Sequence, residues 1–268
     1  MRSLFLLVIA VSFFSCAQNN VDVDQSLEKY FTQNNVDGCF GMLNNKNGRI
    51  TVYNLERYRD SAYLPASTFK IVNALIGLQT GVISNDSMVI KWDGVTRSVP
   101  GWNRDVSMYE AFRISDVPYF QEVARRIGKD TMQHWLDTLA YGSTKIKTQI
   151  DSFWLDGSLK ITPDEQLGLV KQLYFYQLPF HKRNQQLVKT AMLMEDKPEY
   201  KLSYKTGLGT DSAGRQIGWV TGWIEENGHP YFFVLNLSTA NQNINMPAVR
   251  MQILNGIVEQ LGFKKGNK

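Results

Sequence analysis

Short apolar runs lie near both ends of the chain and are separated by polar turns. Near the start, residues 39–43 and 50–55 are two such runs, and the polar loop between them contains Asn47-Gly48. Near the end, residues 218–238 repeat this arrangement around Asn227-Gly228. Because Asn-Gly between apolar runs is a strong hairpin signal, the sequence predicts a pair of antiparallel strands at each end.

Other stretches have the spacing of helices. Residues 25–36 predict one helix, and residues 200–207 predict one more strand before the second hairpin. Between residues 66 and 196 the pattern is mainly helical, with candidate helices at 109–114, 119–128, 131–139 and 163–175. The last stretch, residues 247–263, predicts an amphipathic helix with an apolar side formed by Val249, Ile253, Ile257 and Leu261.

These elements predict an α+β fold. Strand pieces from both ends of the chain should join into one antiparallel sheet packed with the N-terminal and C-terminal helices, with the helical region inserted between them. We expect a single domain over residues 23–264. Its sheet part would comprise residues 23–65 and 197–264, and its helical part residues 66–196, with a cleft where the two parts meet.

One predicted helix carries a charge that its apolar character does not explain. The sequence PASTFK at residues 65–70 opens a helix with no polar face, since its apolar positions are Phe69, Ile71, Val72, Ala74, Leu75, Ile76 and Leu78. A helix that is apolar all round is normally buried, whereas lysine is rarely buried without a partner. Lys70 therefore needs a chemical reason to be in the first turn.

Burial would change the chemistry of Lys70. Removal from water lowers the pKa of an amine, so Lys70 should be neutral, able to act as a base or to react with carbon dioxide to give a carbamate. Ser67 lies three residues earlier on the same helical face, and a hydroxyl beside a base is an activated nucleophile. The alternatives are that Ser67 is only a helix cap and that Lys70 extends to solvent.

A second motif favours the catalytic interpretation. Lys205-Thr206-Gly207 lies on the predicted strand, where it could supply a positive charge, a hydroxyl and space for close approach of a substrate. Its alternative is an edge strand that happens to carry a lysine. Ser115, two residues before Val117, indicates by itself only the start of a helix.

The net charge and the absence of certain motifs exclude several classes of function. The chain has 268 residues, 43% of them hydrophobic, and a formal net charge of +4, so we expect no nucleic-acid partner. None of the histidines lies in a recognisable catalytic motif, which excludes a Ser-His-Asp hydrolase. Metal-ligand spacings and a glycine-rich phosphate loop are also absent from the sequence, so we expect no metal and no organic cofactor.

The N-terminal segment has the layout of a secretory signal. Arg2 precedes a short apolar run, which ends in small residues around Cys16. Cleavage before Cys16 would leave a cysteine able to carry a lipid, whereas cleavage after Ala17 would release a soluble protein. We expect a signal peptide over residues 1–16, of lipoprotein type, and export to the periplasm, with an outer-membrane anchor in the lipoprotein case. Only Cys39 remains beyond Cys16, so an internal disulfide is not expected.

Taken together, these motifs resemble the class D β-lactamases from about residue 24 to residue 261. The shared pieces, in order, are Ser67-Thr68-Phe69-Lys70, Ser115-Asp116-Val117, Tyr141-Gly142, the stretch FWLDGSLKITPDEQ with Trp154, Lys205-Thr206-Gly207, and GWVTGW. The resemblance implies a β-lactamase/DD-peptidase-like fold and a small-molecule β-lactam substrate, with carbon dioxide or bicarbonate needed only to modify Lys70.

The resemblance also implies a role for each matching residue. Ser67 would be the acylated nucleophile and N-carboxylated Lys70 its general base. Trp154 would donate its indole N–H to the carbamate, Val117 would shield it from water, and Ser115 would relay a proton. The substrate carboxylate would be held by Lys205, Thr206 and Arg250. The backbone N–H groups of Ser67 and Leu208 would form the oxyanion hole beside Gly207.

One departure and two competing functions remain. The family usually has Tyr-Gly-Asn where this chain has Tyr141-Gly142-Ser143, which puts in doubt the hydrogen bonding of one wall of the site. A transpeptidase or carboxypeptidase, or a β-lactam sensor that is acylated once, would share much of the same chemistry. The sequence does not determine which β-lactams are hydrolysed or the oligomeric state.

Overall fold

Seven strands form one sheet, in the order β1-β3-β2-β9-β8-β7-β6. The computed structural model describes residues 20–268, so the predicted signal peptide and Cys16 lie outside the described residues. Every neighbouring pair is antiparallel except β1 and β3. The strands are β1 (Val21–Val23), β2 (Asp37–Asn44), β3 (Arg49–Tyr53), β6 (Leu193–Asp196), β7 (Lys201–Thr210), β8 (Gln216–Glu226) and β9 (His229–Thr239).

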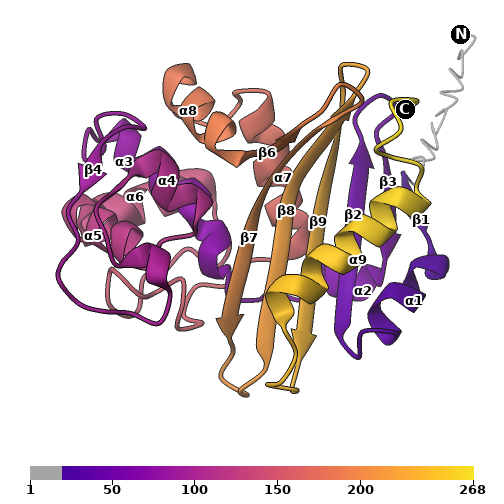
Figure 1. The fold of residues 1–268 in the computed structure, drawn as a ribbon, viewed down its shortest axis with the longest axis horizontal. Coiled ribbons are helices and arrows are strands. Elements are labelled where there is room, and N and C mark those ends of the chain that lie inside the picture. The colour runs from indigo at the N-terminus through magenta and orange to yellow at the C-terminus, as the bar shows by residue number, and fades with distance from the viewer. Residues whose placement is uncertain (1–19) are drawn as a thin grey trace, which may run out of the picture.

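The sheet separates two hydrophobic cores, because successive side chains on a strand point to opposite faces. On β8, Val220 and Ile224 belong to one core, and Trp219 and Trp223 belong to the other. The first core is closed by α1 (Glu28–Thr32) and α9 (Met246–Gln260), which lie on the same face of the sheet (Figure 1). The second is closed by α7 (Pro163–Tyr174) and by the helical region.

The helical region lies beside β7 (Figure 1). Its central helix, α3 (Lys70–Gln79), is buried at every residue from Lys70 to Leu78, as its apolar sequence predicted. Also in this region are the 3-10 helix η2 (Ala66–Phe69), α4 (Met108–Arg113), α5 (Val117–Ile127), α6 (Lys129–Leu139) and α8 (Lys182–Met192). Helix α2 (Leu55–Asp60) lies instead against β2 and α7. Smaller elements are η1 (Gln25–Leu27), η3 (Pro100–Trp102), β4 (Val89–Ile90) and β5 (Val106–Ser107).

The predicted α+β class is confirmed, and so are both hairpins. At the turn between β8 and β9, Asn227 and Gly228 have φ angles of 50° and 75°, the left-handed conformation that favours this pair. The helix predicted over residues 25–36 is shorter, with one 3-10 turn followed by α1. The sequence did not predict α2, α8, β1, β6 or the small β4–β5 pair. In the part of the chain that is described, no helix has the length and apolar character needed to span a membrane.

Candidate active site

Ser67 and Lys70 meet at the start of the buried helix. The segment Ala66–Phe69 forms the 3-10 helix η2, and α3 begins at Lys70. A 3-10 helix has three residues per turn, so side chains three apart lie directly over one another. Lys70 Nζ donates a hydrogen bond to Ser67 Oγ over 2.6 Å. The predicted pairing of a hydroxyl with an amine is therefore present, in a 3-10 turn rather than in an α-helical one.

Lys70 is fully buried, and this sets its ionisation. Its exposed fraction is 0%, and burial lowers the pKa of its amine from 10.5 to about 7, although the charge on Asp116 acts in the opposite direction. A large fraction of the amine is consequently neutral near pH 7. A neutral amine in contact with Ser67 can accept a proton, and it can also react with carbon dioxide.

The hydroxyl of Ser115 lies between two buried lysines. Ser115 Oγ accepts a hydrogen bond from Lys205 Nζ over 2.9 Å, and a longer one from Lys70 Nζ over 3.4 Å. Ser115 has a φ of 58°, in the left-handed region, just before α5 begins. Burial lowers the pKa of Lys205 well below its ordinary value, and the charges of Lys70 and Arg250 act in the same direction. The contacts form a continuous path for a proton from Ser67 through Lys70 and Ser115 to Lys205.

Trp154 packs against the turn that holds Ser67. Its ring stacks on Phe69 with centroids 5.2 Å apart, and its backbone carbonyl accepts a hydrogen bond from Ala66 N over 3.1 Å. Its indole N–H is buried and has no hydrogen-bond partner in the described chain. Buried donors are almost always paired, so this N–H is a candidate donor to a group bound or formed in the site.

The strand β7 forms the other side of the site. Lys205 is buried, Thr206 is half-buried, and Leu208 is exposed to 42%. Arg250 reaches this strand from α9, where its Nη1 donates to Gly207 O over 2.7 Å. Burial lowers the pKa of Arg250 only to about 10, so it remains charged at neutral pH. Its Nε is buried without a hydrogen-bond partner in the described chain, which leaves a donor available for an anionic ligand.

The comparisons with known proteins agree with this geometry. Residues 38–259 match the penicillin binding protein transpeptidase domain. The chain is 37% identical to the β-lactamase OXA-5 of Pseudomonas aeruginosa, over 91% of this chain and 92% of that protein. It superimposes on the class D β-lactamase FUS-1 of Fusobacterium nucleatum with a TM-score of 0.85 and 35% identity, covering 90% of this chain and 99% of that one.

The chain belongs to the class D β-lactamase family.

A regulatory protein is also among the relatives of this class D chain. The regulatory protein BlaR1 of Bacillus licheniformis is 32% identical to it, over 78% of this chain and 34% of that protein. Its match covers a smaller share of both chains, at lower identity, than the match with OXA-5. Within residues 20–268, no three His, Cys, Asp or Glu side chains gather in a way that could hold a metal ion.

Three residues hold η2 in place in this class D chain, and the sequence did not single them out for this purpose. Thr68 Oγ1 donates to Pro65 O over 2.7 Å and accepts from Gln166 Nε2 at the same distance. Gln166 Nε2 also donates to the hydroxyl of Tyr141 over 3.3 Å. Gln166 comes from α7, nearly one hundred residues away, so no local sequence signal could have identified this contact.

Ser143 retains a connection at the position where the family usually has Asn. Its Oγ accepts a hydrogen bond from Lys160 N over 3.1 Å, and its backbone N–H donates to Lys160 O over 2.8 Å. Gly142 has a φ of 55°, and a Cβ there would lie 2.1 Å from Lys160 O, so glycine is required at this position. The segments at Ser143 and Lys160 are therefore still joined to each other, with serine in place of the amide.

Gly207 is a point of close approach between β7 and the turn at η2. A Cβ added to it would lie 3.0 Å from Pro65 O and 3.2 Å from Thr68 Cγ2. We expect Gly207→Ala to displace η2 from β7, with a loss of about 1–3 kcal/mol in the free energy of unfolding and at least about tenfold in hydrolysis rate. Chemical unfolding and initial rates measure the two effects.

The matched control for this change is Gly168→Ala. Gly168 lies inside α7, and a Cβ there meets no atom within 4 Å. Alanine is favoured over glycine inside a helix, so the control should be as stable as the parent protein or more stable, by up to about 1 kcal/mol. Equal behaviour of the two variants would show that Gly207 is not a close-approach position.

Proposed function

We propose that the protein is an exported serine β-lactamase, which opens the β-lactam ring of penicillin-type antibiotics through an acyl-enzyme on Ser67 and so confers resistance to them. The observation that carries this proposal is the contact of 2.6 Å between the fully buried amine of Lys70 and Ser67 Oγ. The family relationship supports the same reaction. The substrate is a small molecule, and the proposal requires no metal and no nucleic acid.

The proposed reaction uses each residue in a defined step. Ser67 Oγ bonds to the lactam carbonyl carbon, its proton leaves along the path that starts at Lys70, and the C–N bond of the ring breaks. Ser115 delivers a proton to the departing nitrogen and regains one from Lys70 across their contact of 3.4 Å, so the nitrogen gains the proton that Ser67 lost. Lys205 orients Ser115 through their hydrogen bond of 2.9 Å. The backbone N–H groups of Ser67 and Leu208 stabilise the oxyanion. Water then hydrolyses the ester and regenerates Ser67.

We further propose that Lys70 is N-carboxylated in the active enzyme. The group fits the residues present, because the buried indole N–H of Trp154 has no acceptor of its own and the amine of Lys70 is neutral enough to react. Val117, at the start of α5, would shield the group from bulk water. When carboxylated, Lys70 supplies the general base for both halves of the reaction. Lys205, Thr206 and Arg250 bind the carboxylate of the substrate.

A chromogenic cephalosporin tests this function directly. When the cephalosporin is mixed in molar excess with the purified enzyme, each enzyme molecule should hydrolyse many substrate molecules. The BlaR1 relationship favours a second candidate, a sensor that is acylated once, and this predicts a single stoichiometric burst with no turnover. A transpeptidase-type enzyme would likewise stop at the acyl-enzyme. A burst alone would therefore contradict the hydrolase proposal.

We expect hydrolysis to weaken as the pH falls below about 7. The pKa of Lys70 is about 7, so a lower pH converts its amine to the ammonium form, which can neither accept a proton nor react with carbon dioxide. A profile of kcat/KM from pH 5 to 9, at constant dissolved carbon dioxide, should show an acid limb near this pH. A profile that is flat down to pH 5 would show that no group in the site needs to lose a proton in this range.

The export of the protein is part of the proposal. The signal peptide at the N-terminus would be removed, and the mature enzyme would act in the periplasm. Cleavage before Cys16 would leave a cysteine that could carry a lipid and anchor the enzyme to the outer membrane, whereas cleavage after Ala17 would release it. Mass spectrometry of the mature N-terminus tests this step. A lipid-modified Cys16 supports the anchored form, and an N-terminus that follows Ala17 supports the soluble one.

A further inference from the structure

Asp116 lies between two residues of the site and is itself buried. It follows Ser115 and precedes Val117, and its exposed fraction is 2%. Its side chain caps α5 by accepting a hydrogen bond from Tyr119 N over 2.9 Å. A helix cap does not require a charge, because serine or asparagine performs it equally well. A buried carboxylate is costly unless it is paired, so the charge at this position calls for a separate explanation.

Asp116 lies where the start of α5 packs against Lys70, and its charge raises the pKa of that lysine. Ser115, directly before it, has its Oγ 3.4 Å from Lys70 Nζ. Phe120, near the start of α5, has its ring centroid 5.9 Å from Lys70 Nζ. Asn73 of α3 donates to Phe120 O over 3.0 Å, which fixes the two helices against each other. The start of α5 is therefore packed directly against the buried lysine.

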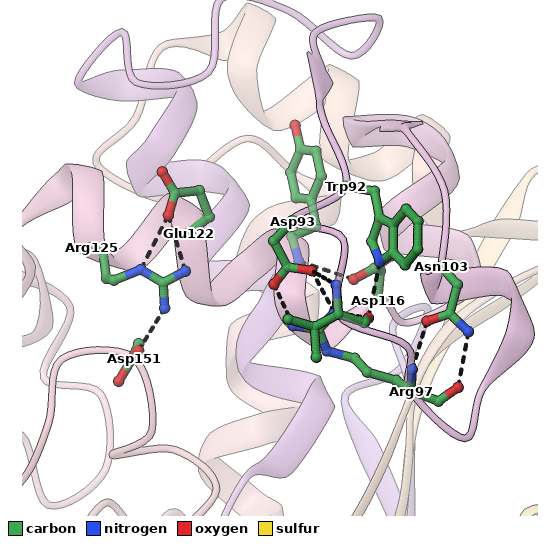
Figure 2. A network of polar contacts seen from close by, with 10 residues as sticks. Trp92, Asp93, Arg97, Asn103, Asp116, Glu122, Arg125 and Asp151 are labelled. Atoms are coloured by element: carbon green, nitrogen blue, oxygen red, sulfur yellow. Dashed lines mark hydrogen bonds and ion pairs between the residues drawn. The ribbon is translucent and has the colours of Figure 1, made fainter.

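On its other side Asp116 shares a cavity with four basic side chains but forms an ion pair with none of them; these are Lys91, Arg104, Arg125 and Arg126. The cavity has a volume of about 360 Å³ and is also lined by Trp92, Asp93 and Glu122. Figure 2 shows that the other two carboxylates of the cavity are paired, since Asp93 binds Arg97 at 2.6 Å and Glu122 binds Arg125 at 3.0 Å. Among the carboxylates that line this cavity in the described chain, Asp116 alone has no ion pair within 4 Å. Burial raises the pKa of Asp116, while Lys70, Arg97 and Arg104 lower it.

We propose that Asp116 is a positioning residue whose negative charge limits the carboxylation of Lys70. The inference rests on the proposed function. In carboxylation, the neutral amine nitrogen bonds to the carbon of CO₂, a C=O electron pair moves onto oxygen, and one N–H proton passes to water. An anion nearby stabilises the ammonium form that cannot react, and it repels the carboxylate that forms. Both effects weaken the affinity of Lys70 for CO₂ and keep its loading dependent on the bicarbonate concentration.

Asp116→Asn tests this inference, because it removes the charge but keeps an oxygen that can accept from Tyr119 N. Parent and variant are titrated with ¹³C-labelled bicarbonate at one fixed pH, and the carbamate signal is followed by NMR. We expect the bicarbonate concentration for half-maximal signal to fall by about tenfold in the variant. The control is Asp93→Asn, which removes a carboxylate from the exposed, paired part of the same cavity and should change this concentration by less than twofold.

The outcomes separate this inference from the proposed function. A carbamate signal in the parent with an unchanged half-maximal concentration in Asp116→Asn overturns the role of Asp116 and leaves the proposed function intact. Absence of the signal from the parent at every bicarbonate concentration overturns both the role of Asp116 and the carboxylation of Lys70, while turnover of the cephalosporin decides the hydrolase function separately. If Asp116→Asn does not fold, Asp116→Ser replaces it, because serine also retains the helix cap. We expect the same fall in the half-maximal bicarbonate concentration from Asp116→Ser.

Discussion

Lys70→Met is expected to reduce β-lactam hydrolysis by about 10²–10⁴-fold while leaving the protein folded and more stable than the parent. The activity is lost because methionine can neither accept a proton from Ser67 Oγ nor be carboxylated. The stability rises because Lys70 is fully buried, and a buried amine whose pKa is lowered from 10.5 to about 7 opposes folding. Methionine fills a similar volume without a polar atom that needs a partner.

Rates of hydrolysis and thermal unfolding of the same sample test both halves of this prediction. The control is Lys189→Met, since Lys189 is a second lysine whose pKa is lowered by burial, and its Nζ donates to Tyr174 O, outside the site. That variant should hydrolyse the substrate at the parent rate. If Lys70→Met retained a rate within tenfold of the parent, Lys70 would not be the base of the reaction.

Trp154→Phe is expected to slow deacylation by about 10²-fold, and added bicarbonate should partly restore it. Phenylalanine keeps most of the stacking on Phe69 but removes the indole N–H, the buried donor that has no partner in the described chain. Without this donor the carboxylated form of Lys70 is less stable, so less of it is present at a given bicarbonate concentration. The acyl-enzyme on Ser67 should then accumulate, where mass spectrometry can detect it.

The matched control for this variant is Trp223→Phe. Trp223 is also buried, and its ring packs on Tyr174 with centroids 5.5 Å apart. The same truncation there should leave the rate and its bicarbonate dependence unchanged. A Trp154→Phe variant that turns over normally without added bicarbonate would show that Trp154 serves only to pack the core.

The sequence was most informative where chemistry and local geometry coincide. Ser67 and Lys70 are three residues apart, so their contact follows from the turn that contains them. The hairpin turn at Asn227-Gly228 could be predicted because its left-handed φ angles favour these two residues. The burial of α3 followed from its uninterrupted apolar sequence.

The remaining parts of the site depend on contacts between distant segments. Lys205 and Ser115 are ninety residues apart, and only the packed fold places their side chains 2.9 Å from each other. The edge strands β1 and β6 are too short to have a period, and their pairing with β3 and β7 decides their structure. Helix α8 is rich in polar residues and was not predicted, because tertiary packing supplies most of the stability of such a helix.

The central claim is that the buried amine of Lys70 captures carbon dioxide and that the carboxylated side chain then acts as the proton acceptor. The most direct measurement is a ¹³C NMR spectrum of the active enzyme with labelled bicarbonate, recorded beside Lys70→Met. We predict one carbamate resonance in the parent, absent from Lys70→Met, whose intensity follows the hydrolysis rate as bicarbonate is varied. Hydrolysis at full rate with no carbamate resonance would contradict the account.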